Sequence, residues 1–322
     1  MLRSGDPPRV AEKLAEPPST EQRVGTLQQD ETGLPWRNPL SAFESDPPVV
    51  RWGAQELPDA WPDALSLRHA RSLWRVAVRV LRGPHSQVSL PEALPGADRI
   101  PRYALQEFHN LPNGNYSKHV THGYGKGFDI AMLGVMKSRR QALAEELADC
   151  RSVLDLGCGA GHAAGAIHER GVPDVWGLDP SPYLLQHAAR SYPEIRFVQG
   201  VAEETEFPDE RFDGLCACFL FHELPPRAIE GALAECHRIL RPGGKLVITE
   251  PGHEHWKAPV LPLIRRYGWR GLYFRSLASL VYEPFLAAFH GDDLADVLAR
   301  HGFSEICVEN EFPTTRWTAV RR

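Results

Sequence analysis

The sequence has few cysteines, no long apolar run and no excess of basic residues, and each absence excludes a class of protein. Among its 322 residues are six cysteines without a Cys-x-x-Cys pair, which argues against a disulfide framework or a zinc knuckle. No stretch reaches the roughly 18 apolar residues that a membrane-spanning helix needs. The net charge of -5 excludes a strongly basic protein that coats nucleic acid, so we expect no nucleic-acid partner. The first residues lack the apolar core of a secretory signal, and we expect a cytoplasmic protein.

The amino-terminal part of the chain is rich in proline and poor in periodic apolar residues. Three Pro-Pro pairs fall within residues 1–60, which we therefore predict to be an irregular or disordered extension. Over residues 62–82, apolar side chains recur at helical spacing, so an amphipathic helix is predicted there. We accordingly assign residues 61–135 to an N-terminal helical cap and residues 136–322 to a separate domain.

From residue 151 onward, short apolar runs alternate with helical patterns. The predicted strands cover residues 152–156, 175–178, 195–198, 212–219, 245–249, 304–309 and 315–320. Strands that alternate with helices form crossover units, and these give a parallel sheet with helices on both faces. The sequence thus predicts an α/β fold.

The strongest chemical signal is a glycine-rich block, VLDLGCGAGH, at residues 153–162. Its glycines fall where the first strand passes into a helix, at a tight turn that lets a ligand approach the backbone. Asp155 lies inside the strand end, and Asp179 ends the next strand. An acid at the second position can hydrogen-bond both hydroxyls of a ribose, which favours a nucleoside-containing ligand over a purely structural turn. His162 stands where a dinucleotide fingerprint has its third glycine, which argues against a nicotinamide enzyme.

Three further blocks extend this pattern: FPDERFD at residues 207–213, FHEL at residues 221–224 and LRPGGKL at residues 240–246. Together with the glycine block, they make residues 110–322 resemble the class I S-adenosylmethionine-dependent methyltransferases. Within that family, the chain is similar to the ubiquinone- and menaquinone-type small-molecule enzymes. The resemblance implies a Rossmann-like seven-stranded sheet whose last two strands form a partly antiparallel edge, with S-adenosylmethionine as the cofactor.

The resemblance also implies which residues bind the cofactor. They are Gly157, Cys158, Gly159 and Gly161 around the methionine and ribose, Cys218 and Phe219 beside the methionine, and Pro180, Ser181 and Ala202 beside the adenine. Asp155 is expected near the methionine amine and Asp179 at the ribose hydroxyls. Family members often carry an aspartate where Val201 stands, and Glu203 is the candidate replacement. Tyr124 matches an aromatic residue that closes over the cofactor in relatives.

Methyl transfer from a sulfonium depends mainly on positioning and on the exclusion of water. A base is needed only if the acceptor must lose a proton, and histidine titrates in the right range. The candidates are His222 and Glu223 after the fourth strand and His253 after the fifth, with His255 beside it; each is alternatively a polar loop residue. The His-x-His spacing could hold a metal, but the acidic constellation of metal-dependent catechol enzymes is absent, so we predict no metal.

An insertion at residues 252–291, between the fifth strand and the last helix, is rich in aromatic residues and arginine. Over the carboxyl edge of the sheet it would form an apolar, positively charged lid. Such a lid suits a small-molecule acceptor that is hydrophobic or aromatic: quinone-like, phenolic or lipid-like. The same composition suits a peripheral membrane contact, or a helical subdomain with its own core. Two other functions stay open: methylation of protein or RNA, and a non-catalytic S-adenosylmethionine-binding module. The sequence predicts no oligomeric state.

Overall fold

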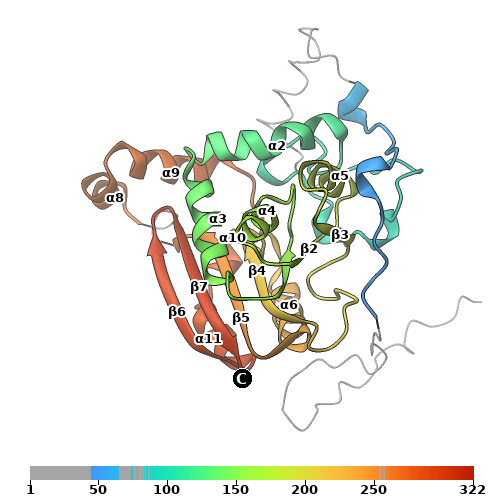
Figure 1. Ribbon diagram of the computed structural model, residues 1–322. Helices are drawn as coiled ribbons and strands as arrows, with labels where there is room; N and C mark the ends of the chain where they lie inside the picture. Colours follow the sequence, from blue (N-terminus) through green and yellow to red (C-terminus); the bar gives the residue numbers. More distant parts are fainter. Residues whose placement is uncertain are drawn as a thin grey trace, which may run out of the picture. The chain divides into compact units, whose positions relative to one another are not determined.

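The computed structural model describes residues 45–64, 88–253 and 258–322, together with Trp74, Val78, Gly83, His85 and Trp256. Its centre is a sheet of seven strands in the order β3-β2-β1-β4-β5-β7-β6 (Figure 1). The strands are β1 (Ser152–Leu156), β2 (Asp174–Asp179), β3 (Arg196–Gln199), β4 (Phe212–Cys218), β5 (Leu240–Pro251), β6 (Phe303–Glu311) and β7 (Thr314–Arg321). Strands β1 to β5 run parallel, and β7 is antiparallel to both β5 and β6. The predicted Rossmann-like α/β sheet with an antiparallel edge is confirmed.

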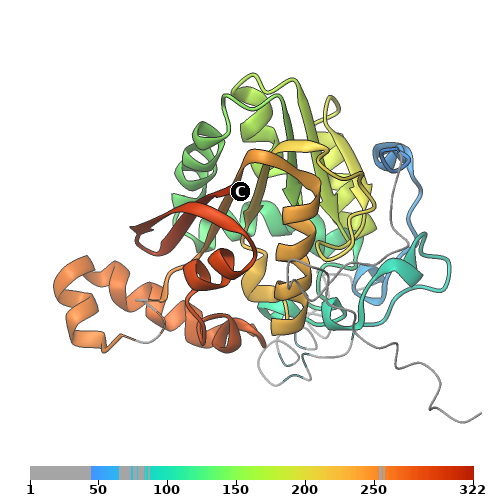
Figure 2. The same cartoon turned by 90° about the horizontal axis from the view of Figure 1, so that it is seen from below.

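Helices cover both faces of the sheet, also as predicted. Val153 and Leu154 of β1 belong to different core clusters, because successive residues of a strand point to opposite faces. The helices on the Val153 face are α3 (Val135–Glu146), α4 (His162–Glu169) and α5 (Pro182–Ser191). Those on the Leu154 face are α6 (Pro226–Ile239) and α11 (Leu294–Arg300). Figure 1 and Figure 2 show the two sets on opposite sides of the sheet.

The order of the strands reverses beside β1. The chain runs outward from β1 through β2 to β3 and then returns to the other side of β1 as β4. At such a reversal the connections leave in opposite directions, and an opening forms outside the carboxyl ends of the strands. The fold therefore places a ligand site at the ends of β1, β2 and β4.

Part of the predicted N-terminal extension packs against the sheet. Trp52, in the 3-10 helix η1 (Trp52–Ala54), is buried in the core of the Val153 face. Its indole Nε1 donates to the backbone carbonyl of Phe197 at 3.1 Å. Residues 45–60 have little regular structure, but this buried tryptophan joins them to the body of the protein. The predicted boundary at residue 60 stays a prediction.

The division into a cap at residues 61–135 and a sheet domain at residues 136–322 stays a prediction. The longest described helix of the cap is α2 (Lys118–Ala131). The other described elements of the cap are the 3-10 helices η2 (Trp61–Ala64), η3 (Ala97–Arg99), η4 (Arg102–Ala104) and η5 (Phe108–Asn110). Residues 1–44 and most of the predicted helix at 62–82 lie outside the described residues.

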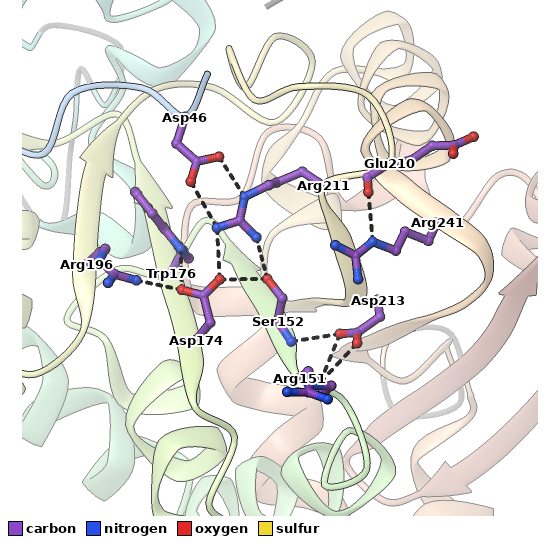
Figure 3. A network of polar contacts seen from close by, with 10 residues as sticks. All are labelled: Asp46, Arg151, Ser152, Asp174, Trp176, Arg196, Glu210, Arg211, Asp213 and Arg241. Carbon is purple, nitrogen blue, oxygen red and sulfur yellow. Dashed lines mark hydrogen bonds and ion pairs between the residues drawn. The ribbon is translucent and has the colours of Figure 1, made fainter. Parts of the chain in front are cut away.

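A polar network at the amino ends of the strands holds the N-terminal segment in place (Figure 3). Arg211 donates from Nε and Nη2 to the two carboxylate oxygens of Asp46, at 2.6 and 2.9 Å. Its Nη2 also donates to Asp174 at 2.8 Å, and its Nη1 donates to the hydroxyl of Ser152 at 2.6 Å. Burial alone would raise the pKa of Asp174, but the hydrogen bonds from Arg211 and Ser152 outweigh it, and the pKa is lowered. This network lies at the edge of the sheet opposite the ligand site.

The carboxylate of Asp63 fixes the start of α2. It accepts hydrogen bonds from the backbone N–H of Ala60 at 2.8 Å, of Lys118 at 3.1 Å and of His119 at 2.8 Å. It also accepts one from the hydroxyl of Ser117, the residue that caps α2, at 3.1 Å. One side chain thereby joins the segment before α2 to the first turn of the helix.

The insertion at 252–291 forms three further helices: α8 (Val260–Tyr267), α9 (Trp269–Leu280) and α10 (Leu286–Phe289). Figure 1 and Figure 2 show α8 projecting from the body on the side of β6 and β7. In the part of the chain that the structure describes, no helix is long and apolar enough to cross a membrane.

Candidate active site

A cavity opens where the carboxyl ends of β1, β2 and β4 meet. The predicted cofactor and catalytic residues that line it are Asp155, Gly157, Cys158, Gly159, Asp179, Pro180, Ser181, Ala202, Cys218, Phe219 and Glu223. Gly161, Glu203, His222 and His253 are not among its lining residues. Tyr124 lies in α2, and its side chain is outside the described part of the chain. The structure thus gathers most of the predicted residues around one space.

Two glycines of the loop after β1 have different roles. Both have a left-handed backbone, with φ of 52° at Gly159 and 81° at Gly161. A Cβ at Gly159 would meet no described atom within 4 Å, so the backbone there is open to the cavity. A Cβ at Gly161 would lie 3.0 Å from side-chain atoms of Ala188 and Phe197. Gly161 allows α4 to pack closely against α5 and β3, and its contact with the cofactor stays a prediction.

The carboxylate of Asp155 caps the first turn of α4 from within the sheet. It accepts from the backbone N–H of Ala164 at 3.0 Å and lies 3.3 Å from the thiol of Cys216. Burial raises the pKa of Asp155 to about 7, although these two hydrogen bonds lower it in part. A positively charged group of a ligand at this end of the cavity would stabilise the ionised carboxylate.

Asp179 joins the end of β2 to the glycine loop and to the start of α5. Its two carboxylate oxygens accept from the backbone N–H of Gly159 at 2.9 Å and of Ser181 at 2.8 Å. Burial raises the pKa of Asp179 to about 6, and the same hydrogen bonds lower it in part. The carboxylate is therefore held in one orientation at the wall of the cavity, as the recognition of a ribose requires.

The predicted adenine end of the cavity is lined by Val201, Ala202 and Tyr103. Glu203, the candidate replacement for the missing aspartate, accepts a hydrogen bond from the hydroxyl of Tyr103 at 2.6 Å. Burial raises the pKa of Glu203. Because Glu203 is not a lining residue, any effect it has on a bound adenine would pass through Tyr103.

Several lining residues come from the segment before the sheet and were not predicted. They are Tyr103, Phe108, Asn115, Tyr116, Phe128 and Arg140. Arg140 is buried in α3, and its Nη2 donates to both carboxylate oxygens of Asp129 at 2.8 Å. The sequence contained one indication of the role of Arg140. It lies on the same face of α3 as the buried residues Met136 and Leu143. A lone arginine on an apolar helix face indicates a buried partner or a ligand.

The predicted catalytic pair after β4 forms the 3-10 helix η6 (Phe221–Glu223), and its two members lie at different depths. Glu223 lines the cavity, whereas His222 is fully buried behind it. The Nδ1 atom of His222 lies 2.5 Å from Oε2 of Glu250 near the end of β5. Burial would lower the pKa of His222, but the neighbouring carboxylates, Glu250 first, raise it. Burial raises the pKa of Glu223.

The third catalytic candidate lies away from the cavity. His253 is exposed, and its ring centroid is 5.1 Å from that of His290. His255 lies outside the described residues. The structure therefore does not bring His253 to the cavity at the carboxyl ends of β1, β2 and β4.

The aromatic insertion packs against elements next to the cavity, and none of its described residues lines the cavity itself. Phe274 of α9 is buried against Met132 and Met136, and the hydroxyl of Tyr273 donates to the carbonyl of Ala131 at 2.7 Å. The predicted lid is therefore corrected: these aromatic side chains pack against the end of α2 and the start of α3. Phe128, which does line the cavity, contacts the same cluster.

The lining residues fit S-adenosylmethionine. Asp179 offers carboxylate oxygens to a ribose, and the backbone at Gly159 is open to close approach. Arg140, which also pairs with Asp129, would offer its buried guanidinium to the methionine carboxylate. The Oδ1 atom of Asn115 is buried and has no hydrogen-bond partner among the described residues, so a ligand could supply the donor that it lacks.

Comparison with known proteins also indicates a methyltransferase. A family described as a methyltransferase domain matches residues 153–244. A demethylmenaquinone methyltransferase from Paenarthrobacter aurescens is 34% identical over 202 residues, which cover 56% of this chain and 74% of that protein. An uncharacterized methyltransferase from Synechocystis is 35% identical over 100 residues, which cover 31% of this chain and 47% of that protein. The chain thus spans about half the length of the Synechocystis relative.

A solved structure of an S-adenosylmethionine-dependent methyltransferase from Archaeoglobus fulgidus aligns with a TM-score of 0.47 and 16% identity. The alignment covers 62% of this chain and 100% of that one. The glycine loop, Asp179 and the demethylmenaquinone relative lead to one conclusion: the chain belongs to the class I S-adenosylmethionine-dependent methyltransferases.

Proposed function

We propose that the protein transfers a methyl group from S-adenosylmethionine to a small hydrophobic or aromatic acceptor, of quinone-like, phenolic or lipid-like type. The observation that carries this proposal is an aromatic wall of the cavity formed by Phe108, Tyr116, Phe128 and Phe219. The rings of Phe128 and Phe219 meet edge to face, with centroids 5.3 Å apart. Such a wall favours a flat apolar molecule. The similarity to a demethylmenaquinone methyltransferase supports the same class of acceptor.

The residues around the cavity would hold the cofactor by its two ends. Asp179 would accept hydrogen bonds from the ribose hydroxyls, and Arg140 would pair with the methionine carboxylate. When bound, S-adenosylmethionine supplies a methyl group on a positively charged sulfur, which is already activated for displacement. The protein then needs mainly to align the acceptor and to exclude water, which suits the apolar wall around Phe128 and Phe219.

Glu223 is the predicted catalytic residue that reaches the cavity. We propose that its carboxyl group orients a hydroxyl or carbonyl oxygen of the acceptor. His222 is too deeply buried to touch an acceptor in this arrangement, and it acts by holding η6 against Glu250. It is therefore a positioning residue.

The test is to incubate the full chain with S-adenosylmethionine labelled in its methyl group and with fractions of a cell lysate. The fractions are an organic extract, water-soluble small molecules, protein and RNA. We expect label in the organic extract, and loss of that label with Asp179→Asn. Label in protein or RNA alone would overturn the small-molecule proposal. Cofactor binding without label in any fraction, even after purified quinone precursors are added, would favour a non-catalytic binding module.

We also propose that α8 and α9 rest on an anionic lipid surface. Large apolar side chains are exposed on both helices: Leu261 at 58%, Trp269 at 66% and Leu280 at 74%. Arg265 and Arg266 are exposed on α8 among them. An apolar face combined with arginines is the composition of an interfacial helix, because the apolar groups enter the acyl boundary while the cations meet the headgroups.

A further inference from the structure

A second cluster of polar side chains lies beside the cavity, behind the wall at Glu223. Its four members, called here the His-Glu cluster, are His109, His222, Glu223 and Glu283. The Nε2 atom of His109 lies 3.2 Å from Oε1 of Glu223 and 3.5 Å from Oε1 of Glu283. That same Glu283 oxygen lies 3.9 Å from Nε2 of His222. Donor atoms of His109, His222 and Glu223 all lie within 4.8 Å of one another.

We propose that the His-Glu cluster binds one divalent first-row transition metal ion. The cluster combines two imidazole nitrogens with two carboxylate oxygens, a set that Zn²⁺, Fe²⁺, Co²⁺ and Mn²⁺ accept. The residues come from η5, η6 and the segment between α9 and α10, so they are far apart in the sequence.

His222 provides the strongest evidence for a ligand. Its Nε2 atom is fully buried and has no hydrogen-bond partner among the described residues. Its Nδ1 atom faces a carboxylate oxygen of Glu250, which also accepts from the backbone. An ionised carboxylate can only accept, so Nδ1 carries a proton, and a metal ion that binds Nε2 would displace any proton there and take its lone pair. A histidine whose other nitrogen donates to a buried carboxylate is the usual arrangement of a metal ligand.

The distances favour a shared ion over a direct hydrogen bond. A hydrogen bond from Nε2 of His222 to Glu283 would need about 2.7–3.2 Å, but the two atoms are 3.9 Å apart. Two ligands held 2.0–2.2 Å from one ion lie between about 3 and about 4 Å from each other, depending on the angle. The observed separations of 3.2, 3.5 and 3.9 Å fall in this range. The donor atoms of His109, His222 and Glu223 all lie within 4.8 Å of one another, so any wider pair needs to close by less than about 1 Å.

The backbone at His109 is held in an uncommon conformation. His109 and Asn110 have φ of 57° and 60°, the left-handed region that residues other than glycine rarely adopt. The backbone N–H of His109 donates to the carbonyl of Tyr282 at 3.0 Å, and the side-chain amide of Asn110 donates to the carbonyl of Leu280 at 2.8 Å. The segment that carries Glu283 therefore holds His109 in place, and left-handed residues of this kind concentrate at functional sites.

The charge balance also favours a cation. Glu223, Glu250 and Glu283 lie close together, and their ion pairs are with His109 and His222. Neighbouring buried carboxylates repel one another, and buried charges in proteins are paired or coordinate metals. An ion in the cluster would be adjacent to the cavity through Glu223, within reach of an oxygen atom of an acceptor. Binding of the ion does not depend on methyl transfer, so the proposal can fail or hold independently of the proposed function.

The experiment titrates the full-length protein, freed of metal with a chelator, with Co²⁺ and with Zn²⁺. Absorption of visible light by bound Co²⁺ reports the geometry, and competition with a chromophoric chelator gives the affinity. The variants are His109→Ala, His222→Asn and Glu283→Gln. His119→Ala is the matched control, because His119 is exposed on α2 and its imidazole Nδ1 lies 3.5 Å from Oδ1 of Asp63, outside the His-Glu cluster. Circular dichroism melting establishes that each variant folds.

We expect one Co²⁺ or Zn²⁺ per chain, with affinity reduced by about 100-fold or more in each of the three variants and unchanged in His119→Ala. Should His222→Asn fail to fold, His109→Ala and Glu283→Gln still decide the question, because both side chains are partly exposed. Equal binding by these variants and the wild type would overturn the proposal, as would binding by the wild type no tighter than that of a surface histidine.

Discussion

The Nδ1 atom of His222 lies 2.5 Å from Oε2 of Glu250, and both side chains are fully buried. The other oxygen of Glu250 accepts from the backbone N–H of Leu220 at 2.9 Å and of Phe221 at 2.7 Å. One carboxylate at the end of β5 thus fixes both the path of the chain after β4 and the orientation of the imidazole. The same segment carries Phe219 and Glu223 to the cavity, so Glu250 shapes the acceptor side of the site without lining it.

Glu250→Gln is therefore predicted to weaken binding of Co²⁺ or Zn²⁺ by the His-Glu cluster. The amide keeps an oxygen that can accept from the backbone but loses the negative charge opposite Nδ1 of His222. Loss of such an outer partner of a metal ligand costs about 10- to 100-fold in affinity. Competition with a chromophoric chelator measures the change. Glu309→Gln, on the exposed face of β6, is the matched control and should bind as the wild type does. Unchanged affinity in Glu250→Gln would remove this carboxylate from the metal site.

Asp179→Asn is predicted to weaken the binding of S-adenosylhomocysteine by about 1–3 kcal/mol, or roughly 5- to 150-fold. The carboxylate is the charged acceptor at the end of β2, and its loss removes hydrogen bonds to the ribose. Isothermal titration calorimetry gives the dissociation constant, and a thermal melt separates this effect from unfolding. Asp149→Asn changes the same group at an exposed position in the turn after α3 and should leave the constant unchanged. Equal affinity of the wild type and Asp179→Asn would contradict the assignment.

The affinity for S-adenosylhomocysteine is predicted to fall as the pH falls below about 6. Burial raises the pKa of Asp179 to about 6 in the protein without ligand. Ribose hydroxyls donate to the ionised carboxylate, so a ligand binds the ionised form, and below this pKa each pH unit costs up to about tenfold. Calorimetry between pH 7.5 and 5.0 should show this decline in the wild type and a smaller one in Asp179→Asn. An identical pH profile for the two proteins would contradict it.

The effect of pH on the stability of the folded protein has the opposite sign to its effect on ligand affinity. For Asp179 and Asp155 the folded-state pKa lies above the value of the unfolded chain, about 3.9. The folded state then binds more protons than the unfolded state between about pH 4 and the folded-state pKa. The contribution of these two groups to stability is therefore present at low pH and is lost as the pH rises through about 6 to 7. Bound cofactor should reduce this loss of stability in the wild type, because it interacts with the ionised carboxylates of the folded state.

The part of the site that the sequence predicts is the part built from contiguous chain. The buried strand β1, the glycine loop and the start of α4 follow one another, so their glycines and acids can be placed from spacing alone. Asp179 is predicted for the same reason, because it ends the next strand. The tight backbone turn and the contact with one ligand restrict which residue types can stand at these positions. Both restrictions act on a short stretch of chain, so a sequence pattern shows them.

The remaining parts depend on contacts between distant segments. His109 and Glu283 meet η6 only in the folded chain, and no spacing rule connects them, so the sequence could not place these side chains together. Trp52 lies in a proline-rich segment without periodicity, yet it is buried by β3. The aromatic residues at 252–291 were predicted to form a lid, because composition alone does not show which face of a helix meets a neighbour. The structure places Phe274 against Met136 instead.

Asp63→Ala is predicted to destabilise the protein by about 2–4 kcal/mol. The side chain is almost fully buried and accepts hydrogen bonds from three backbone N–H groups and one hydroxyl, which the alanine would leave without an acceptor. Denaturation by urea gives the free energy of unfolding. Asp59→Ala is the matched control: Asp59 forms one exposed ion pair with Lys118, and its loss should cost less than about 1 kcal/mol. Similar losses for the two variants would show that the clamp on α2 contributes little.

The combined substitution of Leu261 and Trp269 by serine is predicted to abolish binding of the protein to anionic vesicles. Both side chains are exposed on α8 and α9, and they are two of the large apolar side chains that would enter the lipid. Sedimentation with vesicles containing phosphatidylserine measures the bound fraction. Val49→Ser is the matched control, since Val49 is exposed near Asp46 and Asp174 at the amino ends of the strands.

The lipid charge provides an independent test of the same surface. Arg265 and Arg266 attract anionic headgroups, so replacing phosphatidylserine by phosphatidylcholine should weaken binding of the wild type, as should raising the salt concentration. If vesicles bind the double serine variant as well as the wild type, α8 and α9 are not the contact surface. If neither protein binds, the exposed apolar face serves no lipid contact, and the acceptor must reach the cavity from solution.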